Sequence, residues 1–130
     1  MTKEEHITYW KEQAEDSWEG AIVLINSKRY MLGLFCWHLS IEKLMKGLWV
    51  KNNPENYPPR THNLIHLHDE ANLQLSEEMQ DNLRVINSWN LEGRYPDYKT
   101  NLYKVSTKEY VDNYTPTILN IKKCLQEILQ

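Results

Sequence analysis

The feature that most constrains the fold is the stretch from Tyr30 to Lys51, which is apolar or small around most of a helical circumference. Its main apolar seam, with alternating steps of three and four, consists of Leu34, Trp37, Ile41, Leu44 and Leu48. A surface helix has one apolar stripe, whereas here small residues that include Gly33 and Gly47 form a second lane. Each glycine disfavours a helix by roughly 1 kcal/mol relative to alanine, which is tolerable where a neighbouring backbone approaches closely. The sequence therefore predicts a central helix with other helices packed on at least two of its sides.

Four further helices are predicted around this central one. They cover Lys3–Ser27, His62–Ala71, Ser76–Trp89 and Thr107–Leu129. Thr2 and Glu5 resemble a capping box at the start of the first helix, and the short turn after that helix makes it antiparallel to the central helix. Pro116 should kink the last helix, or restart it with Thr115 as the cap. The segment from 90 to 106 has no helical period and is predicted to be a loop.

The length of 130 residues suits one domain, over residues 1–130. The predicted fold class is all-α, an antiparallel up-and-down bundle of four to five helices. A net charge of −3 gives no overall attraction to nucleic acid, so any phosphate site must be a local patch. Because the first residues lack a signal peptide's apolar run and the central helix carries charges, we expect a cytoplasmic protein with no membrane span. Cys36 and Cys124 are expected to be buried, reduced thiols.

The central helix carries one polar ladder, made by His38, Glu42 and Lys46 at steps of four. It can be a Glu–Lys pair whose carboxylate is shared with the histidine, which would contribute a few tenths of a kcal/mol. It can also be a polar strip that faces a groove, because charges on a largely buried helix need partners. The residue types alone leave both interpretations open.

A second polar group follows the proline-rich loop after the central helix. His62, His66 and Asp69 share one face at helical spacing, and two imidazoles one turn apart can bind a divalent metal. With no other ligand cluster in the sequence, and with Thr61 placed as a helix cap, a polar helix start is the favoured interpretation. We predict neither a metal site nor a cofactor.

Within the predicted loop, the residues most suggestive of a binding site are Arg94-Tyr95-Pro96-Asp97-Tyr98. The planar fork of Arg94 suits a phosphate or a carboxylate, and two tyrosines could stack on a base. The alternative is an internal brace in which Arg94 bonds to Asp97 and the tyrosine rings cover the core. On residue types alone, the brace is slightly favoured.

Three separated motifs give the chain a resemblance to a known family. They are Tyr30…Phe35…Ser40-Ile41-Glu42-Lys43…Lys46-Gly47, Thr61-His62-Asn63-Leu64 and Arg94-Tyr95-Pro96-Asp97. Their order and spacing resemble the HEPN domain. The resemblance implies an up-and-down helical bundle that forms a homodimer. It also implies an association with nucleotides or RNA, and with a small nucleotidyltransferase partner in toxin–antitoxin or defence pairs.

The resemblance also bears on catalysis. Many members of the family are metal-independent ribonucleases, in which a histidine moves a proton and an arginine stabilises the charged phosphorane. Arg94 matches that arginine, but the residues five to seven places later are Lys99, Thr100 and Asn101, and no histidine follows His68. This departure leads us to predict that the chain has no catalytic residues.

The function predicted on this basis is binding of a nucleotide or RNA, of a nucleotidyltransferase partner, or of both. The expected groove is lined by His38, Lys43, Lys46, Arg94 and Tyr98, while Glu42, His62, Tyr95, Pro96 and Asp97 serve as motif or structural residues. Two alternatives remain open. One is a ribonuclease with His38 or His62 as a non-standard general base, and the other is a purely structural interaction module.

Overall fold

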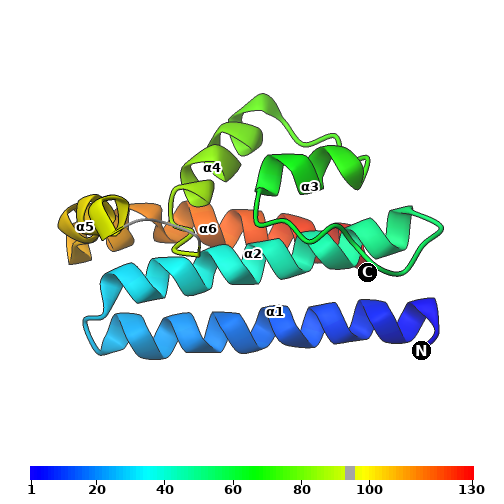
Figure 1. Ribbon diagram of the computed structural model, residues 1–130, viewed down its shortest axis with the longest axis horizontal. Coiled ribbons are helices and arrows are strands. Elements are labelled where there is room, and N and C mark those ends of the chain that lie inside the picture. Colours follow the sequence, from blue (N-terminus) through cyan, green and yellow to red (C-terminus); the bar gives the residue numbers. More distant parts are fainter. Residues whose placement is uncertain (93–95) are drawn as a thin grey trace.

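The computed structural model describes the backbone of residues 1–92 and 96–130, and the side chains of residues 1–92 and 101–130. Within these residues the chain is helical and without strands (Figure 1). The helices are α1 (Lys3–Asn26), α2 (Tyr30–Asn52), α3 (Leu64–Glu70), α4 (Glu77–Asn87), α5 (Pro96–Val105) and α6 (Lys108–Leu129). The predicted all-α class is confirmed, as are the central helix and the antiparallel pairing of α1 with α2.

Helix α2 is the centre of the molecule. It contacts each of the other five helices, with α1 along one side and α3 and α4 on the opposite side (Figure 1). Fourteen of its 23 residues are buried, and every member of the predicted apolar seam is among them. The expectation of packing on at least two sides is therefore confirmed.

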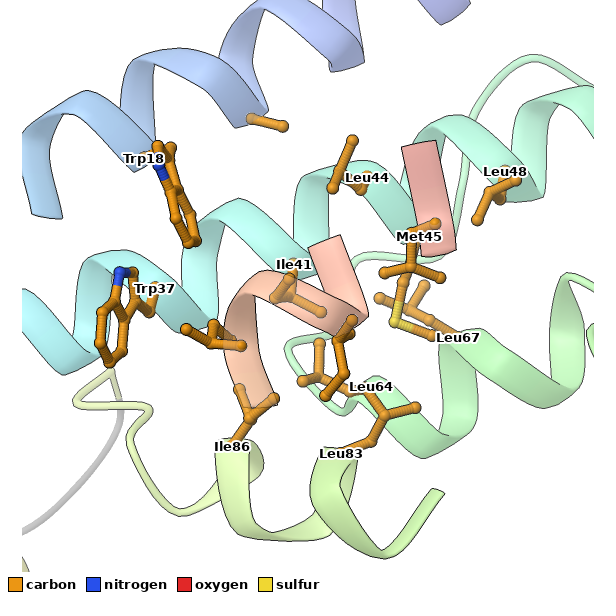
Figure 2. Close-up of a cluster of buried hydrophobic side chains, with 14 of the residues drawn as sticks. Trp18, Trp37, Ile41, Leu44, Met45, Leu48, Leu64, Leu67, Leu83 and Ile86 are labelled. Carbon is orange, nitrogen blue, oxygen red and sulfur yellow. The ribbon is translucent and has the colours of Figure 1, made fainter. Parts of the chain in front are cut away.

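The core is formed where the seam of α2 meets side chains from the surrounding helices. Figure 2 shows Ile41 and Met45 of α2 among leucine and isoleucine side chains of α3 and α4. On the α1 side, the indole of Trp18 stacks on that of Trp37, with ring centroids 6.1 Å apart. Burial of these large side chains is the main stabilising contribution to the bundle.

The small lane of α2 permits close contact with α1. A Cβ atom built at Gly33 would lie 2.6 Å from Cγ1 of Ile25, which is closer than two carbon atoms can pack. The turn between the two helices is equally tight, since Lys28 adopts a positive φ of 63°. The helical cost of the glycine is thus offset by a close approach of α1 to α2.

The helix starts show which capping predictions were right. Thr2 and Glu5 form the predicted capping box, with both hydrogen bonds present. Thr61 does not cap α3. Its hydroxyl accepts from the backbone N–H of Asn63, whereas the Asn63 side chain accepts from the backbone N–H groups of Ile65 and His66. Helix α3 therefore begins at Leu64, and His62 lies before it rather than on it.

One prediction about the last third of the chain was wrong, and one of the two alternatives at Pro116 is excluded. Residues Pro96–Val105 form helix α5, where a loop was predicted. Proline is favoured at the first position of a helix, but in so short a segment the apolar positions are too few to show a period. Helix α6 is not restarted at Thr115, whose hydroxyl donates to the carbonyl of Val111. The helix runs through Pro116 without a new cap.

Lysines tie the two chain ends to the end of α2. Lys3 Nζ donates to the carbonyls of Val50, at 2.7 Å, and Asn53, at 2.8 Å. Lys51 Nζ donates to the carbonyls of Ile128, at 2.6 Å, and Gln130, at 3.0 Å. These carbonyls include ones that helix ends leave without intrahelical partners. Figure 1 shows both termini at the same end of the bundle.

The remaining expectations concern the thiols and the membrane. Cys36 and Cys124 are free and half-buried, rather than fully buried as predicted. Burial raises the pKa of the Cys36 thiol, which disfavours the reactive thiolate. No helix in the part of the chain that the structure describes combines the length and apolar character of a membrane-spanning segment.

Candidate functional site

The polar ladder of α2 is buried and converges on the carboxylate of Glu42. The Glu42 side chain is only 4% exposed, and both its oxygens have partners. Oε2 accepts from Lys46 Nζ at 3.0 Å, and Oε1 lies 2.8 Å from Nδ1 of His62. An ion pair this deep in the bundle is stable only if its members are well bonded, which these contacts achieve.

His62 is held in place by its backbone as well as by its ring. The segment after α2 runs back along α2 before it enters α3 (Figure 1). The carbonyl oxygen of His62 lies 3.0 Å from Nε2 of His38, a side chain that is fully buried. A carbonyl only accepts, so this nitrogen of His38 carries a proton and donates. His38 and Glu42 together fix the position and the ring orientation of His62.

The other edge of the His62 ring faces the surface. The side chain is 39% exposed, and its Nε2 contacts the carboxylate of Glu92, which is 56% exposed. Each ring nitrogen of His62 thus meets a carboxylate oxygen, which can only accept. With a proton on both nitrogens, the ring can donate on one side to a buried carboxylate and on the other to an exposed one.

The structure gathers some of the predicted groove residues but not others. His38 and Lys46 lie with Glu42 behind His62, and both are buried. Lys43 is directed toward α1, where its Nζ donates to the hydroxyl of Ser17 at 2.8 Å. Lys46 also approaches α1, with its Nζ 5.5 Å from the ring centroid of Trp10. Glu42 pairs with Lys46, and its Oε1 lies 3.8 Å from Nδ1 of His38, so the ladder matches the interpretation of a shared carboxylate.

The predicted arginine–tyrosine group cannot be compared with the structure. Arg94 and Tyr95 lie outside the described residues. Pro96, Asp97 and Tyr98 belong to the first turn of α5, but their side chains also lie outside the described part. The choice between a phosphate site and a brace at Arg94 stays a prediction.

The metal hypothesis at His62, His66 and Asp69 required one helical face, and α3 starts too late to provide it. His68 Nδ1 instead lies 2.8 Å from Oδ1 of Asp69, and His68 Nε2 accepts from the backbone N–H of Leu75. Among the residues that the structure describes, no group of three or more histidine, cysteine or acidic side chains could hold a metal ion.

Glu92 is the residue of this cluster that sequence reasoning missed. It lies outside the ladder and the histidine motif, 50 positions after Glu42, and has no spacing relation to either. The only available signal was its place two residues before Arg94. The backbone N–H of Glu92 donates to the side chain of Asn90 at 3.2 Å, a short local turn that follows α4.

Comparison with known proteins gives one match. The family model for the HEPN domain matches residues 7–128, nearly the whole chain. A search of curated proteins found no significant match. A search of solved structures likewise found none.

Proposed function

Because this chain belongs to the HEPN domain family, we propose that it is a non-catalytic binding domain for a phosphate-bearing ligand, a nucleotide or RNA. The association of the family with a nucleotidyltransferase partner, in toxin–antitoxin or defence pairs, extends this proposal to a protein partner. Only the site can carry the argument further, because one fold serves many functions.

The observation that supports the proposal is the partly exposed ring of His62, which is held by the buried carboxylate of Glu42. An N–H on a partly exposed, positively charged ring is a donor suited to a phosphate oxygen. Its orientation is set from behind by Glu42 and His38, so little side-chain entropy is lost on binding. Glu92, which contacts this ring, is two residues from Arg94, the second predicted phosphate contact.

In this proposal the predicted residues do not all line the ligand groove. His62 and Arg94 contact the ligand, and Tyr98 stacks on a base. Lys46 and His38 act on the site through their neighbours. Lys46 balances the charge of Glu42, and His38 holds the backbone carbonyl of His62. Lys43 lies on the side of α2 that faces α1, where it bonds to Ser17.

A ribonuclease is the second candidate, and one observation favours it. A histidine oriented by a buried carboxylate is the arrangement of a general base in several hydrolytic enzymes. The Glu42–His62 pair has that arrangement, at 2.8 Å. Against this candidate, no histidine follows Arg94 at the spacing of the family. Proton transfer by a positioned histidine raises a reaction rate by about 10²–10⁴. Without such a histidine, RNA cleavage should be slower by about that factor.

The test is a titration of the purified protein with nucleotides and with short labelled RNAs. Replacing His62 with alanine is expected to weaken binding by about 10- to 100-fold, the contribution of one charge-assisted hydrogen bond. The matched control is His66→Ala, which removes an exposed histidine of α3 and should leave affinity unchanged.

The same samples decide between the two candidates. We expect the RNA to stay intact throughout the titration. Cleavage that is lost in the His62→Ala protein would replace the binding proposal with the ribonuclease. Equal affinity of wild-type and His62→Ala proteins would remove His62 from the site.

We also propose that the protein is a homodimer. The sequence has five tryptophans and eight tyrosines, and apolar side chains such as Val23 and Leu119 are exposed on α1 and α6. Light scattering at micromolar concentration should give about twice the chain mass of 15.6 kDa. A mass that stays at one chain over that range would refute the dimer.

A further inference from the structure

We propose that Glu92 is an internal competitor for the anion position on His62, so that a phosphate-bearing ligand binds there by displacing the Glu92 carboxylate. This inference rests on the proposed function, because it concerns the same ring. It adds a regulatory contact within the chain, which keeps weakly binding anions out of the site.

The two carboxylates on His62 differ in how firmly they are held. Glu42 is buried, and its second oxygen is bonded to Lys46, so its release would leave an ammonium without a partner in the core. Glu92 is more than half exposed, and it lies in the connection after α4, outside any helix. Exposed ion pairs of this kind contribute little to stability. An incoming anion therefore displaces Glu92 and leaves Glu42 in place.

Charge balance points the same way. With His62 protonated and Glu92 in contact, the positive charges of His62 and Lys46 are matched by the negative charges of Glu42 and Glu92. When Glu92 leaves, the remaining group of three carries one net positive charge beside the surface. This group thus favours an anion beside Nε2 of His62, and Glu92 supplies one in the absence of a ligand.

The chemistry of the contact defines the ligand class. A carboxylate oxygen and a phosphate oxygen both accept from an imidazolium N–H. A phosphate monoester carries nearly two negative charges and three acceptor oxygens, against one charge and two oxygens on Glu92. A terminal phosphate, whether on a nucleotide or free in solution, is thus the anion best able to replace the side chain.

The experiment compares wild-type protein with Glu92→Gln and Glu70→Gln. Glu92→Gln keeps the size of the side chain and removes its charge. Glu70→Gln makes the same change at an exposed position of α3, outside the contacts of His62. Dissociation constants are measured by calorimetry for inorganic phosphate and for adenosine 5′-monophosphate. The His62 ring nitrogen shifts are followed by NMR, at a pH near 6 where histidine is largely protonated.

We expect Glu92→Gln to bind both probes about two- to fivefold more tightly than wild type, because the competing state is removed. Glu70→Gln should bind as wild type does. Addition of phosphate to the wild-type protein should move the His62 ring signals toward those of a phosphate complex of Glu92→Gln. A preference for the nucleotide over free phosphate would identify the nucleotide as the source of the anion.

Two results would overturn the inference. Unchanged or weaker binding by Glu92→Gln would show that Glu92 does not compete, even if the wild type binds nucleotide or RNA as proposed. Failure of Glu92→Gln to bind either probe would show that no anion site lies beneath the carboxylate. The proposed function fails separately, when the wild type binds neither nucleotide nor RNA.

Discussion

Replacing Glu42 with alanine is expected to lower the free energy of unfolding by about 3–5 kcal/mol. The carboxylate is buried and is the counter-charge of Lys46, whose side chain is only 11% exposed. Without this carboxylate, the ammonium of Lys46 loses its counter-charge in a poorly solvated environment, and the ring of His62 loses the contact that orients it. For a chain of this size the melting temperature should fall by on the order of 10 °C or more. Thermal unfolding followed by circular dichroism measures the change.

Two further variants separate charge from packing at this position. Glu42→Gln combined with Lys46→Met removes both charges and keeps most of the volume, so it should recover much of the lost stability. Asp112→Ala removes one partner of the exposed Lys108–Asp112 pair, which has the same spacing on its helix. That change should leave the melting temperature nearly unchanged. A melting temperature of Glu42→Ala close to that of wild type would show that water reaches the Glu42–Lys46 pair.

Replacing Trp89 with alanine is expected to cost about 3–5 kcal/mol. The side chain is fully buried just after α4, and its Nε1 donates to the hydroxyl of Tyr110 at 2.9 Å. Its ring also lies edge-on to Tyr114 and tilted against Trp37, with centroids 5.5 and 6.0 Å away. Alanine would leave a cavity between α2, α4 and α6 that the surrounding helices can fill only in part. Urea unfolding should show a lower midpoint with an unchanged slope.

The controls for Trp89 divide its contribution between the ring and the hydrogen bond. Trp89→Phe keeps an aromatic ring but removes the donor, and it should cost about 1–2 kcal/mol. Tyr57→Ala removes an aromatic ring that is 80% exposed, and it should have little effect on the midpoint. Equal losses in Trp89→Ala and Tyr57→Ala would mean that α4 does not pack on the core as described.

The main helices were predictable because their apolar residues repeat at helical spacing over many turns. The seam of α2 and the inward face of α1 are long enough to exclude a strand pattern. Prediction failed where a local signal was weak. The start of α3 depends on whether Thr61 or Asn63 caps it, and both residue types are suitable. At the end of α6, the spacing of Ile121 and Leu125 predicts that Ile128 faces inward, but Ile128 is exposed and Leu129 is buried instead.

The candidate site was only partly predictable for a different reason. Glu42 and Lys46 are one turn apart on one helix, so their contact follows from spacing alone. The contacts of His62 with Glu42, and of Glu92 with His62, join residues 20 and 30 positions apart. They depend on how the segment after α2 returns along that helix, and no local pattern encodes that path. The direction of Lys43 toward Ser17 likewise depends on the packing of α1.

The lysine contacts at the end of α2 have a consequence for joining this domain to others. Lys3 and Lys51 hold the first turn of α1 and the last turn of α6 to the same place. A protein fused to either end would therefore leave from that end of the bundle, away from α5 and the turn between α1 and α2 (Figure 1). Chains with adjacent termini also tolerate circular permutation and insertion into a host loop. The bundle has the geometry of a unit that can be linked in either order, or inserted whole, without rearranging its core.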